Sequence, residues 1–161
     1  MNREYEQITK DILNNKKFQS LKNEVHHHNS NRYNHCLEIS KKTYKVCKKL
    51  NLDYMSATRA ALVHDFFFED EFKNKKQQLL KHPKQALKNA NQIISLNEKE
   101  QNIIESHMNP VGKKCPRYKD SIVVDIVDDI VSIKEKIGGD FEYLKVATNF
   151  LFIIFVELLI K

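Results

Sequence analysis

Two polar residues interrupt an apolar stretch of this chain. Residues 61–70 read A-L-V-H-D-F-F-F-E-D, so His64 and Asp65 follow Ala-Leu-Val and precede three phenylalanines. Burying an ionised carboxylate beside an imidazole costs free energy unless both groups find partners. Imidazole and carboxylate together form a ligand set for Mn, Fe, Co, Ni or Zn. We therefore expect a divalent transition-metal ion as the partner of this pair.

Further histidines lie where helices are expected to begin or end. His64 and Asp65 fall near the carboxyl end of one expected helix. His82, beside Pro83, is expected at the start of another helix, and His107 near the end of a third. Neighbouring residues on a helix point about 100° apart, so His64 and Asp65 would straddle one ion or a pair of ions. A single buried histidine is more often an ordinary core residue, so the inference depends on the whole set.

Helices must position these residues, because no segment alternates with the two-residue period of a strand. We expect helices over 2–14, 16–24, 32–50, 54–67, 82–94, 96–108, 118–136 and 141–161. The connections are too short for a second domain. The sequence therefore predicts an all-α protein, with one domain over 1–161, a core over about 25–136 and a metal site between its central helices.

The composition restricts the partners and the compartment. The chain has 161 residues and a formal charge of +6 that comes mostly from lysine, which favours anionic partners, although most lysines belong to solvated faces. Its cysteines, Cys36, Cys47 and Cys115, form no C-x-x-C pair, which favours a reducing compartment. The first residues form no apolar signal region. We expect a cytoplasmic protein.

The apolar run F-L-F-I-I-F-V-E-L-L-I at 150–160 raises the question of a membrane. It is shorter than the roughly 20 residues of a spanning helix and contains Glu157. Membrane association is therefore not expected. A core helix or a homodimer interface formed by the C-terminal helix over 139–161 fits the run better than an interfacial anchor.

The ordered motifs resemble the HD superfamily of metal-dependent phosphohydrolases, which have an all-α HD-domain bundle. The likeness covers roughly residues 25–135. It rests on N-H-C-L-E-I at 34–39, V-H-D at 63–65, K-H-P-K-Q-A at 81–86, E-S-H-M-N-P at 105–110 and I-V-D-D at 126–129. The chain looks most like small bacterial HD proteins, and next like HD hydrolases of dinucleoside polyphosphates and HD cyclic-dinucleotide phosphodiesterases.

The resemblance implies which residues would bind metal. One ion would be held by His35, His64, Asp65 and a late aspartate, and His82 and His107 would complete a second ion that Asp65 bridges. HD proteins without the two middle histidines usually look mononuclear, so the resemblance favours two ions here.

The late aspartate is not chosen by periodicity alone. On a helical wheel of 122–135, Asp125 falls in the polar arc, whereas Asp128 and Asp129 flank the apolar arc on opposite sides. Both flanking residues stay open on this ground. The apolar-apolar-Asp ending of the family motif favours Asp128.

The activity implied is hydrolysis of a phosphate ester or phosphoanhydride bond in a nucleotide or similar small substrate, through a metal-activated hydroxide. Asp65 would orient that hydroxide. His27, within the histidines at 26–28, would bind phosphate or protonate the leaving group, and the alternative is an exposed polar loop.

One departure from the family bears on the substrate. The dinucleotide-cleaving relatives usually have Lys three residues after the aspartate of the His-Asp pair, where this chain has Phe68. Three phenylalanines, 66–68, are more often core than a platform for a nucleobase. Phosphate contacts would then come from Arg32, Lys84, Lys113, Lys114 and Arg117.

Three other functions remain open. A mononuclear nucleotidase-like protein would use His82 and His107 structurally. A non-catalytic HD scaffold would bind a nucleotide or a protein partner, and the absent Lys keeps this alternative open. A nucleic-acid-binding protein would show steep salt dependence without metal, but no DNA-reading motif supports specific nucleic-acid binding.

Overall fold

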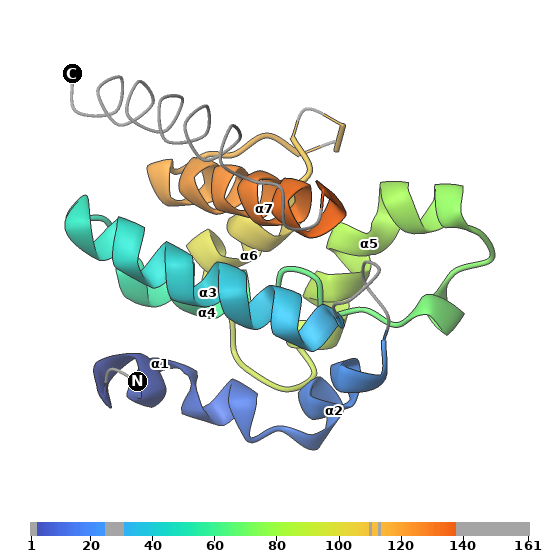
Figure 1. Cartoon of the computed structure of the whole chain (residues 1–161), viewed down its shortest axis with the longest axis horizontal. Helices are drawn as coiled ribbons and strands as arrows, with labels where there is room; N and C mark the ends of the chain where they lie inside the picture. The colour runs from blue at the N-terminus through green and yellow to red at the C-terminus, as the bar shows by residue number, and fades with distance from the viewer. Residues whose placement is uncertain (1–2, 25–30, 110, 113, 138–161) are drawn as a thin grey trace.

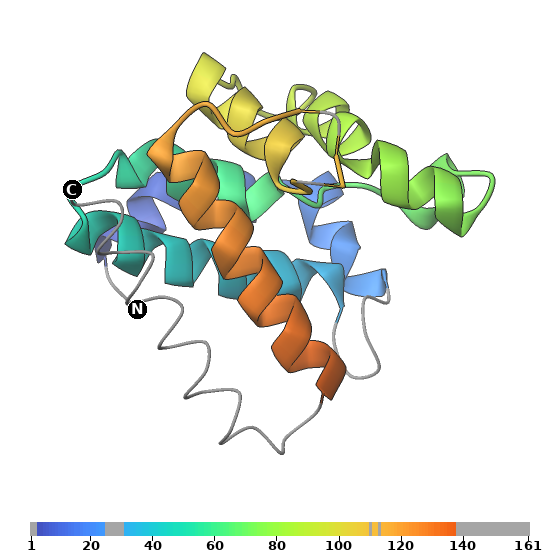
Figure 2. The same ribbon diagram turned by 90° about the horizontal axis from the view of Figure 1, so that it is seen from above.

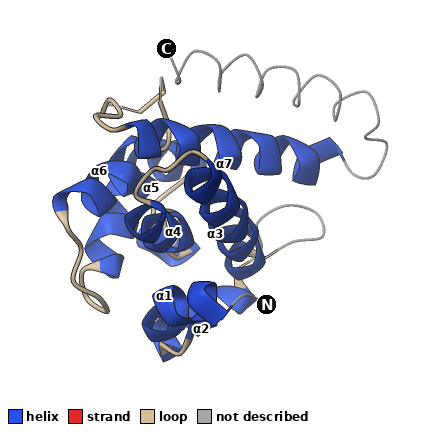
Figure 3. Cartoon of the chain, turned by 90° about the vertical axis from the view of Figure 1, so that its left-hand side faces the viewer, coloured by secondary structure: helices blue, strands red, loops and turns tan. Residues whose placement is uncertain are grey.

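The computed structural model of the protein describes residues 3–24, 31–109, 111–112 and 114–137 (Figure 1). The elements are α1 Arg3–Leu13, α2 Lys16–Gln19, the 3₁₀ helix η1 Ser20–Asn23, α3 Arg32–Lys49, α4 Tyr54–Val63, the 3₁₀ helix η2 Glu69–Glu71, α5 Lys75–Ala90, α6 Glu98–Ser106 and α7 Lys119–Ile137. Within these ranges the chain has no strand (Figure 3). The all-α prediction is confirmed.

Besides the short α2, which Asn15 caps, four of the helices begin at a side chain that caps the first turn. Each of these residues accepts a hydrogen bond from the backbone N–H three positions later, which satisfies one of the donors left free at a helix start. The capping residues are Asn31 of α3, Asp53 of α4, Asn74 of α5 and Asn97 of α6. Three of these four capping residues are asparagines, so part of the asparagine content of the sequence has a structural use.

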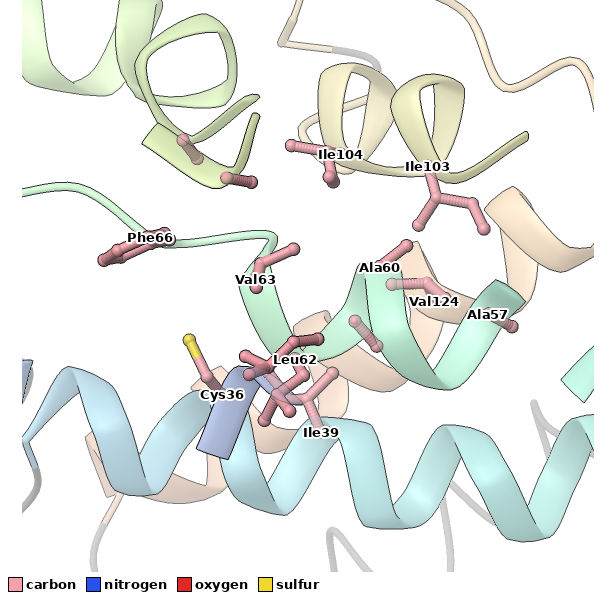
Figure 4. Close-up of a cluster of buried hydrophobic side chains, with 14 of the residues drawn as sticks. Cys36, Ile39, Ala57, Ala60, Leu62, Val63, Phe66, Ile103, Ile104 and Val124 are labelled. Atoms are coloured by element: carbon pink, nitrogen blue, oxygen red, sulfur yellow. The ribbon is translucent and has the colours of Figure 1, made fainter. Parts of the chain in front are cut away.

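Helix α4 lies at the centre of the fold. It is enclosed by neighbours, and Figure 4 shows Ala57 and Ala60 on the side that faces α6, near Ile103. Leu62 packs toward Ile39 of α3 in the same view. All of these side chains have an exposed fraction of 0%. The small alanines let neighbouring helices approach closely, so α4 holds its carboxyl end in a fixed place within the core.

The other helices cover α3 and α4 from two sides. Helices α1 and α2 lie on one side and α7 on the other (Figures 1 and 3). Seen from above, α7 crosses α3 obliquely (Figure 2). Buried Cys36 and Cys47 belong to the core face of α3. The start of α3, the ends of α4 and α6 and the middle of α5 and α7 supply the residues discussed below.

Two helix boundaries differ from the prediction. The helix expected to begin at His82 begins at Lys75, because Asn74 caps it, and it continues through Pro83. His82 therefore lies inside a helix rather than at its start. Helix α4 ends at Val63, not near Phe67. The three phenylalanines follow it without helical structure.

Some predictions fall outside the described residues. They include the C-terminal helix over 139–161 with its homodimer interface, and the histidines at 26–28 with His27. Lys113 is also outside. Among the helices that are described, none has the length and apolar character needed to cross a bilayer.

The buried face of α4 gives a stability prediction. Leu62→Ala should lower the free energy of unfolding by about 2–5 kcal/mol, because it leaves a cavity in a packed core. Met55→Ala on the same helix is the matched control, since Met55 is 54% exposed and should change stability by about 0.5 kcal/mol or less. Urea unfolding with a chelator present measures both. Equal losses for the two variants would contradict the central position of α4.

Candidate metal centre

Six buried side chains from five helices converge at one place. They are His35 on α3, His64 and Asp65 at the end of α4, His82 on α5, His107 at the end of α6 and Asp128 on α7. None of them is more than 8% exposed. The structure thus brings together every residue that the sequence proposed as a metal ligand.

Two overlapping groups have the geometry of metal sites. In each group, one ligand atom per residue lies within 4.8 Å of the others. One group contains His35, His64 and Asp128, and the other contains His64, Asp65 and His107. Nε2 of His35 lies 3.2 Å from Oδ1 of Asp128.

Asp65 lies between the two halves of the cluster. Its Oδ1 is 3.4 Å from Nε2 of His82 and 3.4 Å from Nε2 of His107. Its Oδ2 is 3.9 Å from Nε2 of His35 and 3.9 Å from Nε2 of His64. One carboxylate therefore presents a different oxygen to each pair of imidazoles.

Backbone carbonyls fix the orientation of three imidazoles. Nδ1 of His64 lies 2.8 Å from the carbonyl oxygen of Ala61, and Nδ1 of His107 lies 2.7 Å from that of Ile104. Nδ1 of His82 lies 3.1 Å from the carbonyl oxygen of Gln78. A carbonyl only accepts, so each Nδ1 carries the proton and donates it. Nε2 of each ring is then left with its lone pair for a metal.

The sequence produces two of these bonds by the same local rule. His64 and His107 each follow the last residue of a helix, and each bonds the carbonyl three positions earlier. Carbonyls in the last turn of a helix lack a helical donor. The histidine thus satisfies the end of its own helix and aims its other nitrogen into the cluster.

Sequence reasoning missed Glu135. Its Oε2 lies 3.0 Å from Nδ1 of His35, so the fourth imidazole is oriented by a carboxylate rather than a carbonyl. Glu135 follows Asp128 by seven residues, which is two helical turns on α7 and places both on one face. That spacing was the signal available in the sequence.

The donor atoms of the cluster are arranged to bind a cation rather than to form hydrogen bonds with one another. Nε2 of His82 lies 2.9 Å from Nε2 of His107, although both rings already carry a proton on Nδ1. Two ligand atoms at about 2.1 Å from one ion and at right angles to each other lie about 3.0 Å apart. Nε2 of His64 and Oδ1 of Asp65 are buried without a hydrogen-bond partner. A bound cation would satisfy all of these atoms.

Opposite charges shift the pKa values within the cluster. Burial lowers the pKa of His35, but Asp128 and Glu135 outweigh burial and raise it to about 10. Burial raises the pKa of Asp65, yet the neighbouring imidazoles hold it well below its usual range. Burial lowers the pKa of His82 to about 4. The cluster therefore keeps its carboxylates ionised, as metal ligands must be.

Helix α7 resolves the open choice of the late aspartate. Asp128 is buried in the cluster, while Asp129 is exposed. The polar arc predicts that Asp125 is exposed, but it is only 8% exposed. Burial, with the charges of Asp129 and Asp128, raises its pKa to about 8. The polar side of α7 is therefore buried at Asp125, which periodicity alone does not show.

The predicted phosphate-binding residues differ in exposure. Lys84, Lys114 and Arg117 are exposed, and Lys114 lies 3.5 Å from Glu105. Arg32 is 1% exposed and bonds protein groups, so it is not an open binding residue as predicted. Its guanidinium points into the protein, where it bonds Glu24 and the Phe67 carbonyl.

The phenylalanines after Asp65 are mainly core residues. Phe66 is 0% exposed and Phe67 is 3% exposed, whereas Phe68 is half-buried against the core. The phenylalanine run can be interpreted either as core or as a platform for a nucleobase, and the burial of Phe66 and Phe67 fits core packing.

No protein-family model, curated protein or solved structure matches this chain. The resemblance to HD phosphohydrolases therefore stays a prediction, and the geometry of the cluster carries the functional inference.

Glu135 is expected to affect metal affinity without binding the metal, through its bond to His35. Glu135→Ala should weaken metal affinity by about 10–100-fold, because His35 loses the group that orients it. Glu135→Gln should have a smaller effect, since the amide oxygen still accepts from Nδ1. Glu98→Ala, an exposed change of the same charge on α6, is the control. Titration calorimetry with Mn²⁺ measures all three, and equal affinities would contradict the role of Glu135.

The pKa of His35 predicts how pH affects the metal-free protein. Folded His35 keeps its proton up to about pH 10, whereas the unfolded chain loses it near 6.5. The stability from this group is therefore complete below pH 6.5 and is lost as pH rises through about 10. With a chelator present, the free energy of unfolding should fall from about pH 7 to pH 9. His35→Gln should reduce that fall, and a rise with pH would contradict a protonated His35.

Proposed function

We propose that this chain is a metal-dependent phosphohydrolase that binds two divalent transition-metal ions. It would cleave a phosphate ester or phosphoanhydride bond of a nucleotide or a similar small phosphorylated substrate. The observation that carries the proposal is the position of Asp65, whose two oxygens face two different pairs of imidazoles.

The donor types favour the metals expected from the sequence. The cluster offers imidazole nitrogen and carboxylate oxygen, which suit Mn, Fe, Co, Ni or Zn. His35, His64 and Asp128 would hold the first ion. His82 and His107 would hold the second, and Asp65 would bridge the two.

Bound divalent ions supply a low pKa for coordinated water and neutralise charge on phosphate oxygens. The chain's own residues supply the rest. Asp65 is held ionised and accepts hydrogen bonds without losing its charge. His64 is fully buried, so the floor of the site excludes bulk water. Such a site suits an attack by water on phosphorus.

Charge and exposure support an anionic substrate of small size. The chain carries a net charge of +6. Lys84 is exposed on α5, but its position two residues after His82 places it about 200° around the helix, on a different face. Lys114 and Arg117 are exposed on the segment between α6 and α7. These cations can bind phosphate groups that extend from the buried cluster.

A non-catalytic scaffold is the second candidate function. Phe68 stands where related dinucleotide-cleaving enzymes usually have Lys, so one expected phosphate contact is missing. A scaffold would keep the metal cluster and bind a nucleotide or protein partner without turnover.

Metal content and turnover test the proposal together. Protein prepared without an affinity tag and loaded with Mn²⁺ or Fe²⁺ should hold about two equivalents per chain. It should hydrolyse at least one member of a panel of nucleotides, dinucleoside polyphosphates and cyclic dinucleotides. His82→Gln and His107→Gln should each reduce kcat by about 100-fold or more, because each removes a ligand of the second ion. Lys88→Ala, an exposed change on α5, should leave kcat unchanged.

Other results for metal content and turnover would favour one of the alternative functions. One equivalent, with full activity in both histidine variants, would establish the mononuclear form. Two equivalents with no turnover of any substrate in the panel would favour the scaffold. No metal at all after anaerobic loading would contradict the proposed function.

A further inference from the structure

Arg32 is a buried arginine beside the metal cluster. It is 1% exposed and is the largest fully buried side chain among the described residues. Its Nη1 donates to the carbonyl oxygen of Phe67 at 3.2 Å and to Oε2 of Glu24 at 3.1 Å. A buried guanidinium is costly, so its contacts must fix something that the fold needs.

Arg32 holds the ring of Phe67 as well as its backbone. The guanidinium carbon lies 3.9 Å from the centroid of that ring, which is the distance of a close cation–π contact. The Phe67 ring in turn lies 5.2 Å from the His82 ring, centroid to centroid. A continuous stack therefore runs from Arg32 through Phe67 to a residue of the metal cluster.

Within its own helix and the metal cluster, the His82 ring contacts Gln78, Asp65 and His107. Its Nδ1 bonds the Gln78 carbonyl of its own helix, so that bond moves with the helix. Asn89 ties α5 to the core through a 3.0 Å bond from its Nδ2 to the Phe66 carbonyl, seven residues beyond His82. That bond fixes the helix but not the tilt of the imidazole. Among the described residues outside α5 and the metal cluster, Phe67 is an aromatic residue whose ring contacts the imidazole and can limit its tilt.

His35, His64 and Asp128 also have supports that do not pass through the Phe67 ring, although Arg32 begins α3 three residues before His35. His35, His64 and Asp128 belong to α3, α4 and α7, and these helices pack directly on one another. Glu135 orients His35, and the Ala61 carbonyl orients His64. The two halves of the cluster are thus supported by different contacts.

We propose that Arg32 is a positioning residue that acts through Phe67 to place the His82 imidazole. It thereby sets the affinity of the second metal position, formed by His82, His107 and Oδ1 of Asp65. This inference rests on the proposed function in requiring two ions.

Stepwise metal binding tests the inference. Co²⁺ titrations, followed by calorimetry and by visible absorption, give separate affinities for the first and second ions. Arg32→Ala should weaken the second ion by about 10–100-fold and leave the first within about threefold. Arg32→Lys should recover part of the loss, since an ammonium can still lie over the Phe67 ring.

A second variant separates positioning from a general loss of stability. Phe67→Leu keeps an apolar side chain but removes the ring, and it should weaken the second ion as Arg32→Ala does. The double variant should be no weaker than either single variant, because both changes break one path. Arg59→Ala is the matched control, since Arg59 bonds Glu100 and Asp11 away from the cluster. It should leave the ratio of the two affinities unchanged.

A readout without metal completes the test. In metal-free protein, ring protons of Phe67 and His82 should show a nuclear Overhauser effect that disappears in Arg32→Ala and persists in Arg59→Ala. Unchanged second-ion affinity in Arg32→Ala, or additive losses in the double variant, would overturn the inference while leaving the proposed function intact. Failure of wild-type protein to bind a second ion would instead count against the dinuclear proposal.

Discussion

The structure depends on the need of a buried anion for cations. Asp65 is enclosed by imidazoles at the centre of the protein, and its Oδ1 has no hydrogen-bond partner there. A proton on an imidazole can balance part of this charge, since, against the effect of burial, Asp65 helps to raise the pKa of His64. A divalent ion would balance it more completely and would also use the lone pairs that face one another at His82 and His107. Five helices meet at this point, four of which bring the imidazoles and Asp65, while α7 adds a second carboxylate, Asp128, and so increases the need for a cation.

Helix ends solve a second problem at the same time. An imidazole can bind metal through either nitrogen, so a metal site needs a contact that fixes which nitrogen carries the proton. At the ends of α4 and α6, a carbonyl that lacks a helical partner takes the Nδ1 proton of His64 and His107. One hydrogen bond finishes the helix and selects the nitrogen that faces the cluster. The position of a histidine directly after a helix is therefore as informative as its identity.

The two halves of the cluster differ in their support. The half on α3, α4 and α7 is built into the packed core, where the alanines of α4 bring the helices close together (Figure 4). The other half relies on α5 and the end of α6, and α5 reaches out from the body of the fold (Figure 1). Its amino-terminal part exposes Leu79 and Leu80. An aromatic ring held by a buried arginine links this outlying helix to the interior. The same six ligands thus combine a rigid part with a part that neighbouring residues can adjust.

The sequence by itself determined the helical class, the caps and the ligand types, because periodicity, Asn and Asp at helix starts, and the chemistry of imidazole and carboxylate are local properties. It also placed the histidines that follow α4 and α6 close to helix ends. Only the tertiary structure distinguished Asp128 from Asp129, turned the polar side of α7 inward at Asp125 and revealed Glu135. It also moved Arg32 from the expected surface into the interior. A helical wheel shows which residues share a face, but what that face meets depends on how α7 and α3 cross, and that crossing is set by long-range packing.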